Sequence, residues 1–238
     1  MKTIGLIGGM SWESSLEYYR IINEAVKGAL GGLHSARCIL YSVDFAEIEL
    51  LQQEGRWQEA GDLLAAAGRS LQRAGADGLV LCTNTMHKLA DVIEAGVSIP
   101  LLHIADATAQ RIGAAGMRKV GLLGTRYTME QDFYKGRLTS RYGLDVLLPA
   151  AEDRDTVHRV IYDELCLGIV RAESKRRYSE IMAALAAAGA EGIILGCTEI
   201  ELLVHETDSP VPLFPTTRIH ALAAVQWALE EGESAKVT

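Results

Sequence analysis

The chain has 238 residues, of which 49% are hydrophobic and 23% are charged, so it is too apolar to be intrinsically disordered and long enough for one large or two small domains. Its 31 acidic and 23 basic residues give a net charge of −8, which argues against nucleic-acid and anionic-membrane partners. Four cysteines without CxxC spacing argue against a disulfide scaffold or a zinc site. The N-terminal apolar run is too short for an export signal or a membrane span, so we expect a cytoplasmic protein that binds no metal.

Short apolar runs alternate with segments of helical periodicity along the chain. Apolar runs of this kind are typical of buried parallel strands, and their alternation with helices predicts an α/β fold with parallel sheets. The expected strands cover residues 3–7, 38–42, 78–81, 100–104, 120–123, 192–195 and 211–214. The expected helices cover residues 16–30, 57–74, 105–115, 129–142, 157–167, 174–188 and 219–230.

The sequence contains an internal repeat. Residues 74–85 align without a gap on residues 188–199, and of the first eight pairs five are identical and three keep charge or branching. Matches in the same order at nearly one offset are the signature of a duplicated unit. Two shorter matches follow the same pattern, residues 4–8 on 120–124 and residues 99–102 on 211–214.

The repeat predicts two similar α/β/α halves with parallel sheets, related by a pseudo-twofold duplication. The first half is expected to cover residues 1–115 and the second residues 116–218, with a last helix at 219–238 that packs back on the first half. Ligand sites in open α/β sheets lie beyond the carboxyl ends of the strands. We therefore expect one active-site cleft between the halves, lined by the segments that follow strands: residues 8–11, 82–85, 124–125 and 196–199.

Residues 7–11 are expected to form a strand that enters a glycine turn. The amides of such a turn can hold a carboxylate or phosphate, although an ordinary turn explains the same sequence. The GxGxxG, GxxxxGK[ST], HExxH and GxSxG motifs do not occur. Dinucleotide, P-loop, zinc-peptidase and α/β-hydrolase functions therefore have no support from motifs.

Cys197 is the first candidate for chemistry. It follows an expected strand and precedes an expected helix, where the helix dipole favours a thiolate, while burial as a small apolar side chain is the competing interpretation. The repeat aligns Thr83, not Cys82, with Cys197. Because side chains alternate along a strand, Thr83 should face the same way as Cys197 and Cys82 should point into the packing, unless a local shift exchanges them. Burial is the simpler interpretation for Cys38, Cys166 and His87.

Four motifs together give the chain, along nearly its full length, a resemblance to the aspartate/glutamate racemase family, closest to its broad-specificity amino-acid racemase branch. They are residues 2–10, Asn-Thr-Met-His at 84–87, Gly-Leu-Leu-Gly-Thr at 121–125 and Gly-Cys-Thr-Glu at 196–199. The resemblance implies two similar α/β halves with the active site between them, and racemisation without a cofactor. Two cysteines on opposite sides of the substrate α-carbon act in the family as thiolate base and thiol acid.

By this resemblance the catalytic pair is Thr83 and Cys197, with Cys82 as the alternative at the first position. Thr83 stands where the family has its first cysteine. A hydroxyl ionises far less readily than a thiol with a pKa of about 8.5, so Thr83 can deliver or relay a proton but would be a poor base. We therefore expect an asymmetric enzyme in which Cys197 abstracts the proton from one enantiomer.

The resemblance also implies a set of substrate-binding residues. Aspartate-specific members are expected to carry basic residues that grip the side-chain carboxylate, but residues 47–52 contain no Arg or Lys, and Cys166 occupies the other basic position. The pocket should therefore tolerate neutral side chains, with Gln52 as a polar contact. The expected substrate-binding residues are Met10, Gln52, Asn84, Thr85, Thr125, Cys166, Thr198 and Glu199.

The main hypothesis is thus a pyridoxal-independent racemase of free amino acids, a small-molecule enzyme without nucleic-acid or membrane partners, for which a homodimer stays open. An aspartate/glutamate-specific racemase, or a cysteine-dependent decarboxylase or isomerase of dicarboxylates, is the alternative within the same resemblance. From another class, a two-lobed amino-acid-binding protein would share the architecture but would need no cysteine at a strand end. A nucleotide-binding regulator lacks a phosphate motif.

Overall fold

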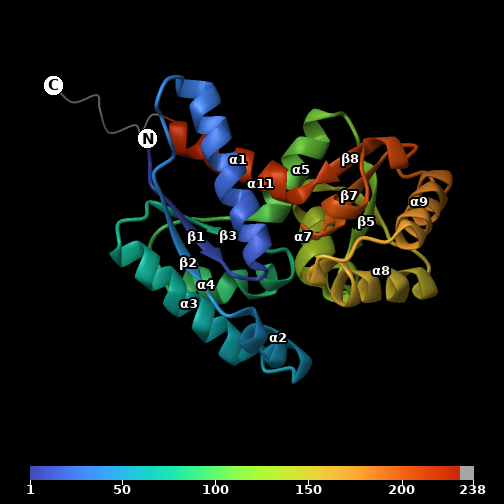
Figure 1. The fold of residues 1–238 in the computed structure, drawn as a ribbon, viewed down its shortest axis with the longest axis horizontal. Coiled ribbons are helices and arrows are strands. Elements are labelled where there is room, and N and C mark those ends of the chain that lie inside the picture. The colour runs from blue at the N-terminus through green and yellow to red at the C-terminus, as the bar shows by residue number, and fades with distance from the viewer. Residues whose placement is uncertain (231–238) are drawn as a thin grey trace. The chain divides into compact units, whose positions relative to one another are not determined.

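The computed structural model describes residues 1–230, which form two parallel four-stranded sheets accompanied by helices (Figure 1). The α/β fold with two similar halves, as predicted from the repeat, is confirmed. Residues 231–238, the end of the predicted last helix, lie outside the described part of the chain. Within residues 1–230, no helix has the length and apolar character needed to cross a bilayer.

The first sheet has the strand order β2-β1-β3-β4. Its central strands β1 and β3 are fully buried, as expected for parallel strands covered on both faces, whereas the edge strand β2 is partly exposed. The strands are β1 (Ile4–Gly8), β2 (Cys38–Ser42), β3 (Gly78–Leu81) and β4 (Leu101–Leu102).

The second sheet repeats this order as β6-β5-β7-β8. The two central pairs also repeat their register, because Ile4 pairs with Gly78 in the first sheet and Val120 pairs with Gly192 in the second. The duplication seen in the sequence therefore extends to strand order and register. The strands are β5 (Lys119–Gly124), β6 (Asp145–Leu147), β7 (Gly192–Gly196) and β8 (Leu213–Pro215).

Most helices follow the predicted segments, with differences at their ends. The predicted helix at 129–142 is interrupted at Gln131, and the one predicted at 157–167 begins earlier and ends in a short 3-10 turn. The α-helices are α1 (Trp12–Leu30), α2 (Phe45–Gln53), α3 (Trp57–Arg73), α4 (Ala90–Ala95), α5 (Ile104–Ala114), α6 (Arg126–Glu130), α7 (Asp132–Tyr142), α8 (Ala151–Asp163), α9 (Ala172–Ala187), α10 (Ile200–Leu203) and α11 (Thr216–Leu229). The 3-10 helices are η1 (Thr85–Leu89), η2 (Leu165–Leu167) and η3 (Glu206–Asp208).

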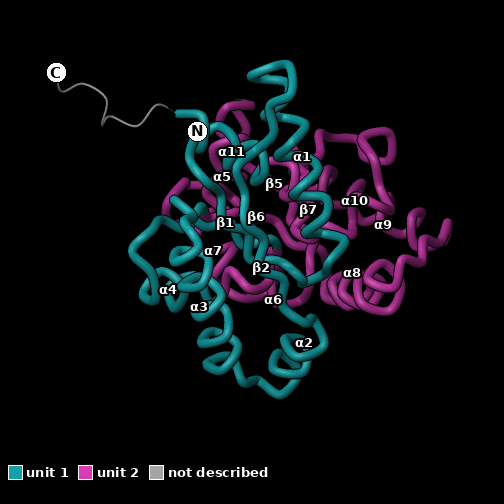
Figure 2. The backbone as a smooth tube through the Cα atoms, turned by 60° about the vertical axis from the view of Figure 1, so that its left-hand side comes forward, with its two compact units in different colours: residues 1–82, 89–102, 220–238 teal, residues 83–88, 103–219 magenta. Residues whose placement is uncertain are grey.

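The chain divides into two compact units that are discontinuous in sequence (Figure 2). Helix α5 follows the last strand of the first sheet but belongs to unit 2, and most of α11 follows the last strand of the second sheet but belongs to unit 1. Unit 1 contains Met1–Cys82, Leu89–Leu102 and, within the described chain, residues 220–230; unit 2 contains Thr83–Lys88 and His103–Ile219.

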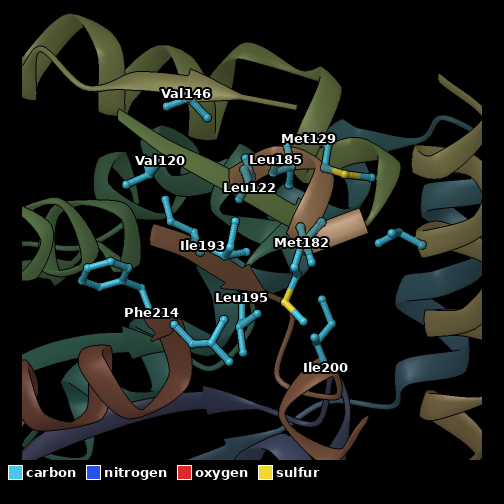
Figure 3. Packing of buried hydrophobic residues seen from close by; sticks show 14 of the residues in the cluster. Val120, Leu122, Met129, Val146, Met182, Leu185, Ile193, Leu195, Ile200 and Phe214 are labelled. Atoms are coloured by element: carbon cyan, nitrogen blue, oxygen red, sulfur yellow. The ribbon is translucent and has the colours of Figure 1, made fainter. Parts of the chain in front are cut away.

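Each unit has its own apolar core. In unit 2, side chains of β5, β7 and the neighbouring helices converge, among them Leu122, Ile193 and Met182 (Figure 3). In unit 1, Tyr18 donates to Nδ1 of the buried His220 at 2.8 Å, and Nε2 of His220 donates to the carbonyl of Leu102 at 2.7 Å. Burial lowers the pKa of His220 to about 4, so this histidine is a neutral core residue.

Candidate active site

The segment that follows β3 is held in unit 2 by His87. The imidazole Nδ1–H donates to the main-chain carbonyl of Thr83 at 2.7 Å, and Nε2 accepts from the amide of Ile104 at 3.2 Å. One ring nitrogen must donate while the other accepts, so this contact pair selects the neutral Nδ1–H tautomer. The 3-10 helix η1 is thereby tied to the first residue of α5.

A second connection links this segment to strand β7. The amide Nδ2 of Asn84 donates to the hydroxyl of Thr216 at 3.0 Å, and that hydroxyl donates to the carbonyl of Leu195 at 2.8 Å. Asn84 and Thr216 are buried. Leu195 lies in β7, two residues before Cys197, so Asn84 is fixed to the strand that carries the candidate thiol.

Three buried threonine hydroxyls gather beside this connection. Oγ1 of Thr85 lies 3.0 Å from Oγ1 of Thr125 and 3.5 Å from Oγ1 of Thr128, and the last two are 3.2 Å apart. Thr125 also caps α6 by accepting from the amide of Thr128. Since each hydroxyl can donate and accept, the group is a polar surface able to hydrogen-bond a carboxylate or an amine.

Cys197 stands directly after the last residue of β7. That residue must be a glycine, because a Cβ at Gly196 would lie 2.8 Å from the carbonyl oxygen of Leu123. The Cys197 thiol donates to a carboxylate oxygen of Glu199 at 2.9 Å, and Glu199 is only 7% exposed. Burial raises the pKa of Cys197 well above that of an ordinary thiol, and the charges of Glu199 and Cys166 raise it further. Cys197 is therefore a neutral thiol beside a carboxylate.

The structure also places Cys166 and Tyr178 near Cys197. Cys166 in η2 and Cys197 are both partly buried and pack against the core of unit 2. Tyr178 is fully buried and donates its hydroxyl to the carbonyl of Val157 at 3.0 Å. The pKa of Tyr178 is raised by burial first and then by negative charge on Cys197, Glu164 and Cys166. All of these groups gain negative charge when they ionise, so each one opposes the ionisation of the others.

Three residues of the predicted site belong to unit 1. Cys82 is completely buried in the core of that unit, and burial raises the pKa of its thiol. Met10 and Gln52 are each 5% exposed. The amide of Gly9 in the predicted glycine turn donates to the hydroxyl of Ser15 at 2.7 Å, so this N–H is satisfied inside the protein and does not need an anion.

The predicted residues of unit 2 are Thr83, Asn84, Thr85, Thr125, Cys166, Cys197, Thr198 and Glu199. The hydrogen bonds add two residues that the sequence analysis missed, Thr216 and Thr128. Thr216 follows strand β8 directly, so the rule that sites lie at the carboxyl ends of strands would have found it. Among residues 1–230, no cluster of three or more His, Cys, Asp and Glu side chains could hold a metal ion.

The protein is an α/β protein with a duplicated fold, in which two parallel sheets have the same strand order. A thiol and several hydroxyls follow the central strands of these sheets. The chain belongs to the Asp/Glu/Hydantoin racemase family, which matches residues 7–224. The predicted family is therefore confirmed. Racemases are isomerases, and this is the enzyme class that family membership assigns.

Two solved structures and one curated relative illustrate the relationship. A crystallised Yersinia pestis protein with a provisional Asp/Glu racemase assignment is 60% identical, with a TM-score of 0.92 over 97% of this chain and 100% of that chain. The aspartate racemase homologue from Pyrococcus horikoshii OT3 is 35% identical, with a TM-score of 0.83 over 96% of this chain and 99% of that one. The broad specificity amino-acid racemase RacX of Bacillus subtilis strain 168 is 22% identical over 162 residues, which is 65% of this chain and 66% of RacX.

Proposed function

We propose that this protein is a cofactor-independent racemase of free amino acids, in which Cys197 and Thr83 serve opposite faces of the substrate α-carbon. The observation that carries the proposal is the hydrogen-bonded chain from Asn84 through Thr216 to Leu195. It ties the residue after Thr83 to the strand that ends just before Cys197. Positioning two proton-transfer groups by buried hydrogen bonds is what catalysis at a single carbon requires.

The polar groups around this connection suit the intermediate of the reaction. Removing the α-proton leaves negative charge that spreads onto the substrate carboxylate, and fixed hydrogen-bond donors stabilise that charge more in the transition state than in the ground state. Asn84, Thr85, Thr125 and Thr198 are the proposed donors. The Thr85 and Thr125 hydroxyls are buried and mutually hydrogen-bonded, so little reorganisation is needed when the charge develops.

The charges beside Cys197 favour substrates with neutral side chains. The ionisable groups that act on the thiol, Glu199 and Cys166, are neutral or negative. A second substrate carboxylate close to them would be repelled. In unit 2, Cys166 is the proposed side-chain contact in place of a cation, while Gln52 and Met10 of unit 1 stay predictions from the sequence. A broad range of neutral amino acids is therefore the proposed substrate class.

Free amino acids are the proposed small-molecule substrates, and the cytoplasm is the proposed location of the protein. A homodimer stays a prediction, which light scattering on the purified protein tests.

Deuterium exchange tests the proposed reaction. The purified protein is incubated with single L- and D-amino acids in deuterated water, and loss of the Cα–H signal is followed by proton NMR while chiral chromatography follows inversion. We expect exchange with inversion for neutral amino acids, and the same rate after treatment with hydroxylamine, which traps pyridoxal phosphate. Exchange that hydroxylamine abolishes would contradict independence of that cofactor. Binding of amino acids without any exchange would identify a binding protein instead.

A further inference from the structure

Helix α6 begins directly after Thr125, and two side chains hold its first turn. The hydroxyl of Thr125 accepts from the amide of Thr128. From helix α8, Nδ1 of His158 accepts from the amide of Arg126 at 3.2 Å. The first amides of a helix have no partner inside the helix, so they need acceptors of this kind. With five residues, α6 makes few hydrogen bonds of its own, and its position depends on neighbouring elements.

The imidazole of His158 is partly buried and packed between two aromatic rings. It lies edge to face against Tyr127 of α6, with 6.2 Å between the ring centroids, and against Tyr162 of α8, with 4.9 Å. A main-chain amide can only donate, so the contact with Arg126 requires Nδ1 without a proton. Protonated histidine carries a hydrogen on both ring nitrogens and cannot accept this hydrogen bond.

The charged groups around His158 come from α6 and α8. Burial is the main cause that lowers the pKa of His158, and the guanidinium of Arg126 lowers it further. The carboxylates of Asp155 and Asp163 in α8 and of Glu130 in α6 act in the opposite direction without reversing the shift. The imidazole is therefore neutral at neutral pH and takes a proton at acid pH.

The start of α6 also sets the positions of two of the three buried hydroxyls. Thr125 precedes the helix and Thr128 lies within it. Their Oγ1 atoms are 3.2 Å apart, and Oγ1 of Thr85 lies 3.0 Å from that of Thr125. His158 does not belong to this group of hydroxyls, but it holds the backbone that carries two of them.

We propose that His158 is a positioning residue for the substrate carboxylate: the neutral imidazole holds the first amide of α6 and so aligns the Thr125 hydroxyl, and protonation at acid pH releases that amide. The inference rests on the proposed function, in which Thr125 donates to the carboxylate. An α-carboxyl group has a pKa of about 3.5, so the substrate carboxylate stays ionised while His158 titrates. Substrate use should thus weaken in acid through the protein and not through the substrate.

Two substitutions separate the acceptor from the ring. His158→Asn keeps an acceptor near the position of Nδ1 but does not titrate, whereas His158→Phe keeps an aromatic ring but has no acceptor. The measured quantity is kcat/KM for exchange of the substrate α-proton between pH 5 and pH 7.5. At pH 7.5 we expect a fall of about tenfold in His158→Phe, since small displacements of a binding group are costly, and a value within about threefold of the wild type in His158→Asn. Towards pH 5 the wild type should lose activity, and His158→Asn should lose much less.

Two further measurements do not depend on activity. Hydrogen exchange of the amides in a peptide that covers residues 125–131 reports on the start of α6, and protection should be lower in His158→Phe than in the wild type and in His158→Asn. Proton NMR titration of the histidine rings follows the imidazole itself. The signal that is missing in His158→Asn should titrate with a midpoint below the ordinary histidine pKa of about 6.5.

Asp155→Asn is the matched control on the same helix. Asp155 forms an exposed ion pair with Arg126, with 2.8 Å between Oδ1 and Nη2, and exposed pairs contribute little to stability. We expect kcat/KM at pH 7.5 within about twofold of the wild type. Because Asp155 favours the protonated imidazole, its loss should move the acid fall of activity to lower pH. A merely structural role of His158 would not produce that displacement.

The other results contradict specific parts of the proposal. Equal losses in His158→Phe and His158→Asn would show that ring packing and not the acceptor holds α6, and unchanged activity and protection in His158→Phe would show that neither does. An acid fall in His158→Asn equal to that of the wild type would assign the pH dependence to another group. If the wild type exchanges no amino acid, the proposed function fails, and protection of residues 125–131 still tests the hold of His158 on α6. If His158→Phe does not fold, the pH profiles of His158→Asn and Asp155→Asn decide.

Discussion

Residues 83–85 after β3 align in the repeat with residues 197–199 after β7, so Thr83 stands in the place of Cys197 and Thr85 in the place of Glu199. At the second strand end a thiol is bonded to a buried carboxylate. At the first, the Thr85 hydroxyl is bonded to a neighbouring hydroxyl of unit 2, and the carbonyl of Thr83 accepts from His87.

The two copies therefore share their strand order and differ in the proton chemistry of the residues that follow the strands. A thiol can ionise and act as a base, although burial and the carboxylate beside it raise the pKa of Cys197. A threonine hydroxyl among other hydroxyls can pass a proton on but cannot hold negative charge at neutral pH. The position before each residue diverged too, because Cys82 is buried in the core of unit 1 while Gly196 has no room for a side chain.

The largest expected effect comes from removing the thiol. Cys197→Ala should lower both exchange and inversion by about 1,000-fold, because the variant lacks the thiol that is proposed to take the α-proton. Cys38→Ala, which changes a thiol of the edge strand β2, should retain wild-type rates in the same NMR assay. A Cys197→Ala protein that still racemises would show that Cys197 is not the base that removes the α-proton.

Removing the hydroxyl at the first strand end should have a different outcome. In Thr83→Ala we expect inversion to fall by about 100-fold, while the enantiomer whose α-proton faces Cys197 still exchanges within about threefold of the wild-type rate. Thr83→Ser keeps a hydroxyl and should invert at close to the wild-type rate. Equal losses of exchange and inversion in Thr83→Ala would mean that Thr83 and Cys197 do not act independently.

Much of this architecture could be predicted from the sequence because buried strands and the repeat leave strong patterns. Cys82 lies in the packed core, as the alternation of side chains after β3 predicts. Among the elements that were missed, two have plain physical reasons. Strand β6 has only three residues and lies at a sheet edge. The sequence signal for the start of helix α2 is confined to Asp44, whose side chain caps the helix by accepting from the amide of Ala46.

The hydrogen-bond partners of the site could not be predicted in the same way. Thr216 follows Asn84 by more than a hundred residues, and no local pattern shows that their side chains meet. The pair of Cys197 and Glu199 lies two residues apart, yet the contact depends on a turn that begins a helix of only four residues. Motifs in the sequence named Asn84, Cys197 and Glu199 as candidates, while tertiary packing decided which side chains each of them contacts.

Thr216 provides the next test, because it joins the two strand ends by hydrogen bonds. Thr216→Val removes the acceptor of Asn84 and the donor to the carbonyl of Leu195, and leaving buried polar groups unpaired costs about 1–3 kcal/mol. The adjacent Thr217 is a matched control, because its buried hydroxyl has no hydrogen-bond partner among the described residues, and Thr217→Val should be neutral or stabilising.

The measurement must report on unit 2. The three tryptophans lie in unit 1, so tryptophan fluorescence would follow the other unit. Hydrogen exchange of amides in peptides that cover residues 83–88 and β7 is the suitable readout, and we expect both peptides to lose protection in Thr216→Val. Protection that falls in only one of them would show that the connection does not hold the strand ends together.

The smallest expected effect concerns the backbone of the first strand end. His87 donates to the carbonyl of Thr83 and accepts from the amide of Ile104, so it fixes the backbone that carries the Thr83 hydroxyl. In His87→Gln we expect inversion to fall by about tenfold, since small displacements of a reacting group are costly, while exchange at Cys197 persists. The exposed His34 gives the control His34→Gln, with an unchanged ratio of inversion to exchange. If His87→Gln lowers both rates equally, the histidine supports the fold of the whole unit, and the positions of the two strand ends are not set separately.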